Sequence, residues 1–315
     1  MDNLTHSLAG AVLGQMGLKR RTGLAMPALI IGANIPDLDA IATVFGTQSL
    51  AMRRGLTHGP IALVILPLLL TVALMLWARW RPSDKRLPVR PGWLLALAYI
   101  GTLSHPALDW LNSYGIRLLE PFSSQWFAGD TLFIIDVWIW TALASAVWLS
   151  RRRERAGQAN WRGPATAGFG AVCLYILANG LITGHAEEST RAEVWEAVPV
   201  ERRLMMTVEV VVANPVPVQF WKREMHWRGS ALYGAGNFTL GGTTALTEML
   251  KPTGMDDPRV ALAAARDHNA RAFLFWSRMP LARVDGDELV LSDQRFGNRL
   301  TRGTFEVRVP LERLK

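Results

Sequence analysis

The residues best suited to chemistry lie in the stretch GTLSHPALDWLNSYG, residues 101–115, which follows the apolar run WLLALAYI. His105 and Asp109 are four residues apart, so on a helix their side chains share one face and can converge on one metal ion. The same spacing also allows a buried hydrogen bond between the two side chains that packs two helices together. The pair alone leaves both interpretations open.

Further residues of metal-ligand type occur in or beside apolar segments, where an ionisable group costs about 2.5 to 3.5 kcal/mol or more and usually faces an interior site. Imidazole and carboxylate ligands without a thiolate suit zinc, manganese or iron. We therefore predict a divalent metal centre, with zinc as the first expectation. If the apolar segments alternate in direction across a membrane, eight such residues fall at the same side: His6, Asp37, Asp39, His58, His105, Asp109, Asp130 and Asp136.

The order of these residues resembles a known family. The segments MDNLTHSLAGAVLG, NIPDLD, RRGLTHGP and SHPALDWLNSYG, within residues 1–115, are similar to bacterial inner-membrane predicted metal-dependent hydrolases, some of them LexA-regulated. That family is distantly similar to zinc-dependent phospholipase C, in which a first-helix His, an Asp, a His and an HxxxD pair supply part of a zinc cluster. The resemblance implies that these roles fall on His6, Asp37 or Asp39, His58, His105 and Asp109.

The similarity to phospholipase C is incomplete beyond the HxxxD pair. That enzyme adds further His residues and a Glu to its cluster, whereas residues 110–184 of this chain contain no His. Asp130 and Asp136, in GDTLFIIDVW, are the carboxylates available to substitute for them. We expect a site with one or two metal ions instead of three.

The chemistry of such a site can be derived from the ligands themselves. A metal held by His and Asp with an open position lowers the pKa of a bound water from about 15.7 towards about 7 and polarises a phosphoryl or carbonyl oxygen. This predicts hydrolysis of a phosphoester or ester by metal-activated water. The predicted ligands are His6, Asp37, His58, His105 and Asp109, and an acid among Asp39, Asp130 and Asp136 is predicted to act as general base or as an additional ligand.

The two acids of NIPDLD differ in their expected positions. Pro36 favours a break in the helix at Ile35, so we expect an irregular turn that presents Asp37 to the metal. Asp39 is then either a second ligand or a hydrogen-bond partner of a ligand.

Three polar residues near the predicted ligands are candidates for substrate binding. Arg53 and Arg54 precede His58, and guanidinium groups pair bidentately with phosphate oxygens; the alternative is contact with lipid headgroups. Asn112 follows the HxxxD pair, where it either hydrogen-bonds substrate or forms the turn.

The elements that must position these residues are apolar helices. The chain has 315 residues, of which 50% are hydrophobic, and a positive mean hydropathy of +0.15, which favours a membrane protein. Residues 59–78 lack any charge over a length sufficient to cross a bilayer. With residues 93–111, 132–149 and 165–183 they predict four spans, preceded by two N-terminal helical segments at residues 4–18 and 24–45.

The distribution of charge predicts the orientation of these segments. Residues 1–186 contain 16 Lys and Arg, and 13 of them fall on one side if the segments alternate. The positive-inside rule makes that side cytoplasmic. The predicted site then opens at the outer face of a bacterial inner membrane.

Residues 187–315 have a different composition, with 18 basic and 17 acidic residues and no stretch long enough to span. MMTVEVVVANP alternates like a strand, LARVDGDELVLSD predicts a hairpin, and residues 258–275 predict a helix that runs into a strand. We therefore predict a helical integral membrane domain over residues 1–186 and a β-rich α+β soluble domain over 187–315, on the extracytoplasmic side.

The predicted function is a membrane-bound metal-dependent hydrolase whose partners are the lipid bilayer and a lipid or phosphoester substrate. A non-enzymatic anchor that presents the soluble domain and an ion-coupled transporter are the alternatives. Ionisable groups near mid-span and internal symmetry would favour a transporter. The net charge of +8 is explained by membrane orientation, so we predict no nucleic-acid partner.

Overall fold

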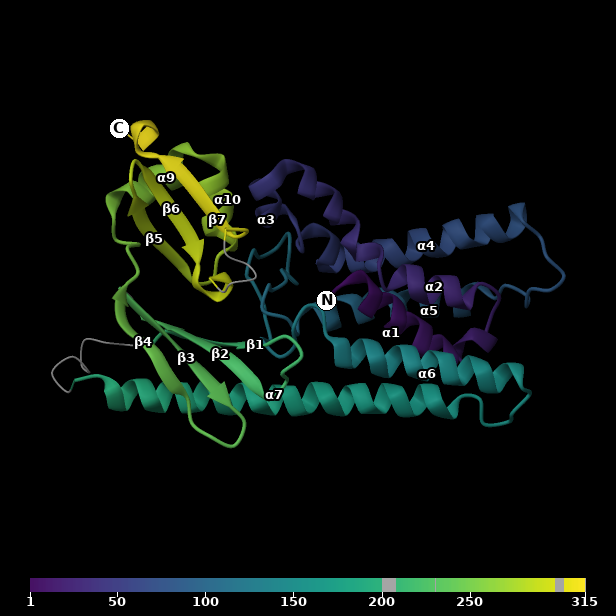
Figure 1. Cartoon of the computed structure of the whole chain (residues 1–315). Coiled ribbons are helices and arrows are strands. Elements are labelled where there is room, and N and C mark those ends of the chain that lie inside the picture. Colours follow the sequence, from purple (N-terminus) through teal and green to yellow (C-terminus); the bar gives the residue numbers. More distant parts are fainter. Residues whose placement is uncertain (200–207, 230, 298–302, 315) are drawn as a thin grey trace. The chain divides into compact units, whose positions relative to one another are not determined.

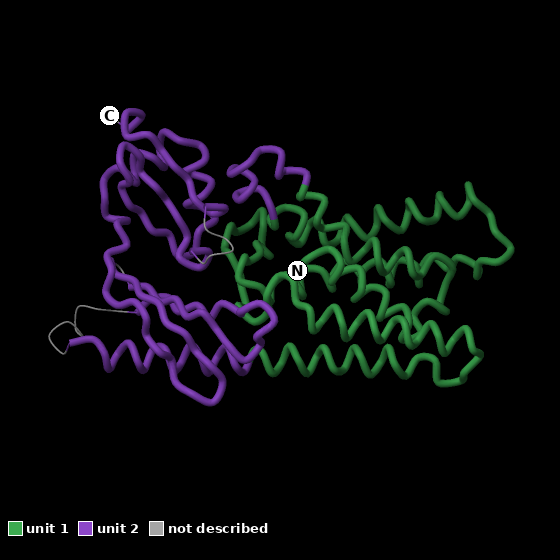
Figure 2. The backbone as a smooth tube through the Cα atoms, viewed as in Figure 1, with its two compact units in different colours: residues 1–40, 54–180 green, residues 41–53, 181–315 purple. Residues whose placement is uncertain are grey.

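The structure is a computed structural model of the chain, and it describes residues 1–199, 208–229, 231–297 and 303–314 (Figure 1). It divides into two compact units (Figure 2). The first comprises Met1–Ala40 and Arg54–Gly180, and the second comprises Ile41–Arg53 and Leu181–Lys315. A helical N-terminal region is thus followed by a sheet-containing region, in agreement with the predicted fold class.

Local capping explains where the main helices of the first unit begin. Asp2 accepts hydrogen bonds from the backbone of Leu4 and Thr5, and proline occupies the first position of both α4 (Pro60–Trp80) and α5 (Pro91–Asp109). Short 3₁₀ helices join the helices: η1 (Leu18–Arg20), η2 (Ile35–Gln48) and η3 (Leu56–His58). The helices are α1 (Asn3–Gln15), α2 (Ala25–Gly32), α4 (Pro60–Trp80), α5 (Pro91–Asp109), α6 (Val137–Arg155) and α7 (Gly163–Ala197).

Three helical segments in the described chain are long and apolar enough to cross a membrane: Ala25–Met52, Pro60–Trp80 and Gly163–Ala197. The predicted count of four spans is therefore not matched. Helices form at all four predicted places, but α5 carries Pro, Ser, His and Asp near its end and α6 ends in the charged run RRRER. Conversely, the N-terminal segment interrupted by NIPDLD continues far enough to be a candidate span, with a kink at Gly46.

The second unit contains two antiparallel sheets. Strands β1 (Val210–Pro215), β2 (Lys222–Arg228), β3 (Leu232–Thr239) and β4 (Ala245–Pro252) pair in chain order, as do β5 (Pro280–Asp285), β6 (Glu288–Asp293) and β7 (Glu306–Pro310). The predicted hairpin is confirmed, because Asp285 pairs with Glu288 across a turn in which Gly286 has φ +61°. The predicted strand in MMTVEVVVANP is β1, although its first three residues lie outside the described chain.

One prediction for this unit was wrong. Residues 258–275 do not run from a helix into a strand but form two helices, α9 (Pro258–Arg266) and α10 (His268–Trp276). Asp267 accepts hydrogen bonds from the backbone of Asn269 and Ala270 and so starts the second helix. The apolar run that follows belongs to a buried helix face, which a short run of this kind does not distinguish from a strand. α10 also packs against α3 (Ser49–Met52), which belongs to the same unit.

The core of the second unit lies between the sheet β1–β4 and the C-terminal part of α7. Ile182 and Val194 of that helix pack with Met225, Trp227 and Phe238 of the sheet. α7 runs from Gly163 to Ala197, across the boundary after Gly180, so it contributes residues to both compact units.

A buried ion pair in the second unit predicts a dependence of stability on pH. Arg295 donates to both oxygens of Asp293, with Nε–Oδ1 and Nη2–Oδ2 distances of 2.8 Å. Burial alone would raise the pKa of Asp293, but the charge and hydrogen bonds of Arg295 lower it from 3.8 to about 2. The carboxylate therefore contributes about 2 kcal/mol to stability above pH 4, and this contribution is lost as the pH falls from about 4 to 2.

Asp293→Asn is accordingly expected to flatten the fall of the melting temperature of the full chain between pH 5 and 2.5, measured by tryptophan fluorescence. Asp285→Asn, which removes an exposed carboxylate, is the control and should keep the wild-type slope. Equal slopes for Asp293→Asn and the wild type would contradict this prediction.

Candidate metal centre

Helix α2 packs against both α1 and α5 in the first unit. A Cβ atom on Gly10 of α1 would lie 2.7 Å from the carbonyl oxygen of Leu29, and one on Gly101 of α5 would lie 2.6 Å from the same oxygen. Glycine at both positions therefore lets the three backbones approach closely. His6 lies four residues before Gly10 and His105 four residues after Gly101, so each shares a helix face with its glycine.

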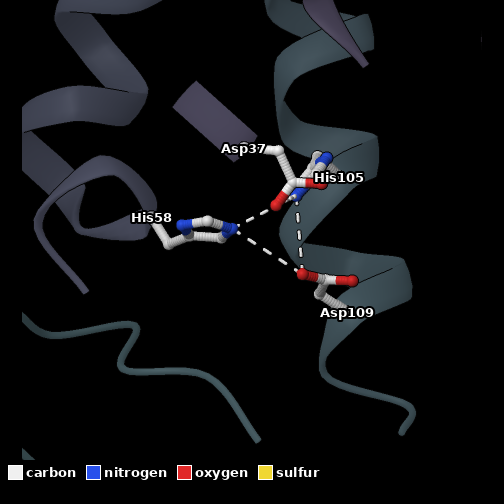
Figure 3. A group of neighbouring side chains, drawn as sticks. All are labelled: Asp37, His58, His105 and Asp109. Atoms are coloured by element: carbon white, nitrogen blue, oxygen red, sulfur yellow. Dashed lines mark hydrogen bonds and ion pairs between the residues drawn. The ribbon is translucent and has the colours of Figure 1, made fainter. Parts of the chain in front are cut away.

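Asp37 and His58 come from the irregular chain between α2 and α4. Asp37 lies in the first turn of η2, immediately after Pro36, as the sequence predicted. His58 is the last residue of η3, and Pro60 then starts α4. Both side chains meet the HxxxD pair at the end of α5 (Figure 3).

The four side chains form a compact group of possible metal ligands. Asp37, His58, His105 and Asp109 each offer one ligand atom, and these atoms lie within 4.8 Å of one another. Nε2 of His105 is 3.1 Å from Nε2 of His58, 3.6 Å from Oδ1 of Asp37 and 3.4 Å from Oδ2 of Asp109. His58, His105 and Asp109 are fully buried, whereas the Asp37 side chain is slightly accessible.

This group fits a divalent cation. Oδ1 of Asp37 is buried and, in the described chain, has no hydrogen-bond partner of normal geometry. Such an atom is costly unless something else satisfies it, whereas Oδ2 of Asp109 already faces Nε of Arg54 at 3.1 Å. Two imidazole nitrogens and two carboxylate oxygens are a donor set that suits zinc, manganese or iron.

The other nitrogen of each histidine ring fixes the ring orientation. Nδ1 of His105 is 2.7 Å from the carbonyl oxygen of Ala33, which only accepts, so Nδ1 carries a proton and donates it to that oxygen, and Nε2 faces the group. Nδ1 of His58 faces Oδ2 of Asp39 at 3.4 Å and Oγ1 of Thr57 at 2.9 Å. Burial lowers the pKa of His58, which favours the neutral ring that a metal requires.

Asp39 thus lies behind a ligand, which was one of its two predicted positions. Its Oδ2 accepts hydrogen bonds from the backbone N–H of Arg54 at 2.6 Å and from Oγ1 of Thr57 at 2.9 Å. A carboxylate in this position orients the imidazole and raises its basicity as a ligand.

His6 adjoins the group without being one of the four residues. Its ring is fully buried and stacks on the His105 ring, with centroids 3.8 Å apart, and its Nε2 is 3.3 Å from Oδ1 of Asp109. The α-amino group of Met1 also forms an ion pair with Asp109. Asp109 therefore faces positive or polarisable groups through both oxygens.

Arg54 binds Asp109, so it differs from the substrate clamp predicted from the sequence. Its Nε is 3.1 Å from Oδ2 and its Nη2 is 3.2 Å from Oδ1 of the carboxylate, and the guanidinium is almost fully buried. Nη1 donates to Oδ1 of Asn112 at 3.0 Å. Asn112 also accepts from the backbone of Tyr114 at 2.9 Å, as expected of a turn-forming residue. Arg53 ends α3 in the second compact unit.

The remaining predicted acids are not members of the four-residue group. Asp136 caps α6: its Oδ1 accepts from the backbone of Trp138 and Ile139, and its Oδ2 accepts from the Tyr175 hydroxyl at 3.0 Å. Both oxygens are thereby engaged in starting α6 and joining it to α7. Asp130 is buried and has a left-handed backbone, with φ +47°.

Sequence reasoning missed Thr57 and the backbone of Ala33, which orient the two ligand histidines. A signal for Thr57 was present, because the tripeptide LTH occurs at residues 4–6 and again at 56–58. In both copies the threonine hydroxyl donates to an aspartate, Asp2 at 2.6 Å or Asp39 at 2.9 Å, and a buried histidine follows. No comparable pattern marks Ala33, whose contribution is a carbonyl oxygen.

Comparisons with known proteins relate the chain to one family. No curated protein and no solved structure matches it. The model of the family described as YdjM inner membrane protein matches residues 1–186, which include every residue of the metal-ligand group. The chain belongs to the YdjM inner membrane protein family.

Proposed function

We propose that this protein is a membrane-bound metal-dependent hydrolase that cleaves a phosphoester or ester of a lipid or lipid-linked substrate. The observation that carries the proposal is the convergence of Asp37, His58, His105 and Asp109, from three separate chain segments, on one buried point. A helix-packing hydrogen bond needs only two such groups. Four such groups, with the two histidine rings oriented by hydrogen-bond partners outside the group, suit a divalent ion.

The four residues would hold the ion, for which zinc is the first candidate and manganese and iron are the others. Bound there, a divalent ion supplies Lewis acidity for hydrolysis. The chain's own residues orient and confine the reaction. Asp39 and Ala33 hold the rings of His58 and His105, Arg54 holds Asp109, and the slightly accessible Asp37 marks the side on which substrate enters.

The neighbours of the ligands support a lipid substrate. Leu38, beside Asp37, is 60% exposed, and Leu56, near His58, is 64% exposed. Exposed leucines so close to a polar centre suit acyl chains better than a water-soluble substrate. The membership of an inner-membrane family and the three apolar helical segments support a lipid substrate further, because they are those of a membrane protein.

The proposal predicts a metal-dependent activity. Full-length protein in detergent should hydrolyse at least one of bis-p-nitrophenyl phosphate, a p-nitrophenyl ester or a phospholipid in mixed micelles. Chelation should reduce the rate to background, and zinc, manganese or iron(II) should restore it. Unchanged activity after chelation would contradict the metal role, and no activity in any metal-loaded form on all three substrates would contradict the hydrolase.

A further inference from the structure

A groove of about 450 Å³ lies along α6 in the first unit, and the proposed hydrolase site does not use it. Its floor is formed by Leu8 of α1 and by Ala144, Val147 and Trp148 of α6, and its rim by Arg151, Arg152 and Arg155. On α6 the floor and rim residues recur at helical spacing, so they follow one face. The groove therefore combines an apolar floor with a basic rim at one end.

The charge of the rim is not neutralised by the protein. The nearest acid along the helix, Glu154, is engaged by Lys19 and Arg20 instead. In the described part of the chain Arg151, Arg152 and Arg155 form no ion pair with an acid. Their three charges exceed the roughly half negative charge of the α6 C-terminus where they lie, so this end of the groove attracts anions.

We propose that this groove binds one anionic phospholipid, with an acyl chain on Leu8, Ala144, Val147 and Trp148 and the phosphate at the three arginines. Free phosphate would leave the apolar floor unused. A zwitterionic lipid would bring an ammonium group to a rim without a carboxylate partner. Trp148 joins the two parts, because Arg152 lies over its ring at 5.5 Å and an indole is stable at the level of the headgroups. Basic pockets among the helices of membrane proteins are suited to such headgroups.

Native mass spectrometry of the full chain tests the site, with dioleoylphosphatidylglycerol as the probe and dioleoylphosphatidylcholine as the neutral reference. The triple variant Arg151→Gln, Arg152→Gln, Arg155→Gln should lower phosphatidylglycerol binding about tenfold or more. A second triple variant, Arg79→Gln, Arg81→Gln, Lys85→Gln, removes the same charge beside α4 and should retain binding. Equal losses in both would show diffuse attraction and overturn the proposal.

A pair of tryptophan substitutions tests the floor independently of charge. Ala144→Trp fills the groove, whereas Ser145→Trp places the same side chain on the next residue, which is also exposed but does not line the groove. Binding of phosphatidylglycerol should be lost in the first and kept in the second, with both proteins monodisperse on gel filtration. Unchanged binding by Ala144→Trp would overturn the acyl-chain position.

Discussion

Full-length protein purified in detergent and dialysed against metal-free buffer is expected to retain close to one divalent ion per chain, and the double variant His105→Ala, Asp109→Ala is expected to retain none. The double variant removes one nitrogen and one oxygen from a group of four ligand atoms. Loss of even an outer partner of a ligand typically costs about 10- to 100-fold in affinity, so loss of two ligands should exceed that. Elemental analysis by mass spectrometry measures the metal directly.

A matched control uses the same pair of residue types away from the group. His268→Ala, Asp256→Ala changes two exposed residues of the second unit and should keep the wild-type metal content. Gel filtration and circular dichroism establish that both double variants are folded. A wild type that remains metal-free after zinc, manganese and iron have been supplied would contradict the metal centre, and His105 and Asp109 would then be a helix-packing pair.

The four residues of the candidate metal centre were predictable from the sequence because their positions follow from local rules. The i, i+4 spacing puts His105 and Asp109 on one face of α5 whatever the helix packs against. The α-helix α2 ends at Gly32, shortly before Pro36, and Asp37 lies in the first turn of the 3₁₀ segment that follows. The cost of ionisable groups beside apolar segments indicated that they face one interior site.

The roles of Arg54 and Asp136 could not be predicted, because they depend on tertiary contacts. A basic residue beside a predicted ligand suits phosphate binding, yet Arg54 binds the carboxylate of Asp109, which is distant in sequence. The same reasoning placed Asp136 at the outer end of its segment but did not recognise it as the residue that caps α6. A cap and a ligand both require a carboxylate, and only the neighbouring backbone N–H groups distinguish them.

The span count and the assignment of residues 258–275 failed for a related reason. Hydropathy measures composition, and it predicted α5 and α6 to be membrane spans like α4. The end of α5, however, carries His105 and Asp109, and the end of α6 carries the charged run RRRER. The grouping of Ile41–Arg53 with the second unit depends on the packing of α3 on α10, more than 200 residues away in sequence. No local sequence pattern predicts a contact between segments so far apart.

Arg54→Ala is expected to be the most destabilising single substitution at the site, and bound metal should reduce its effect. Arg54 is the buried cation that pairs with Asp109 through two nitrogens, so its removal leaves Asp109 with one charged partner fewer, beside Asp37. Removing one member of a buried pair typically costs about 3–5 kcal/mol. A divalent ion in the group supplies positive charge next to the same carboxylate and offsets part of that loss.

Melting temperatures of the chelated and zinc-loaded full chain measure both effects. Arg54→Ala should fall further below the wild type when chelated than when zinc-loaded. Arg54→Lys keeps the charge but loses the second hydrogen bond, so its melting temperature should lie between those of the wild type and Arg54→Ala. Alanine is the proper replacement because Arg54 has φ +52°, and glycine would relieve backbone strain while removing the side chain. The control Arg79→Ala, at an exposed position on α4, should leave both temperatures unchanged.

An Arg54→Ala protein as stable as the wild type under chelation would mean that the ion pair does not hold Asp109. Equal losses with and without zinc would separate Arg54 from the metal centre, because a cation bound beside Asp109 must weaken the penalty for losing another.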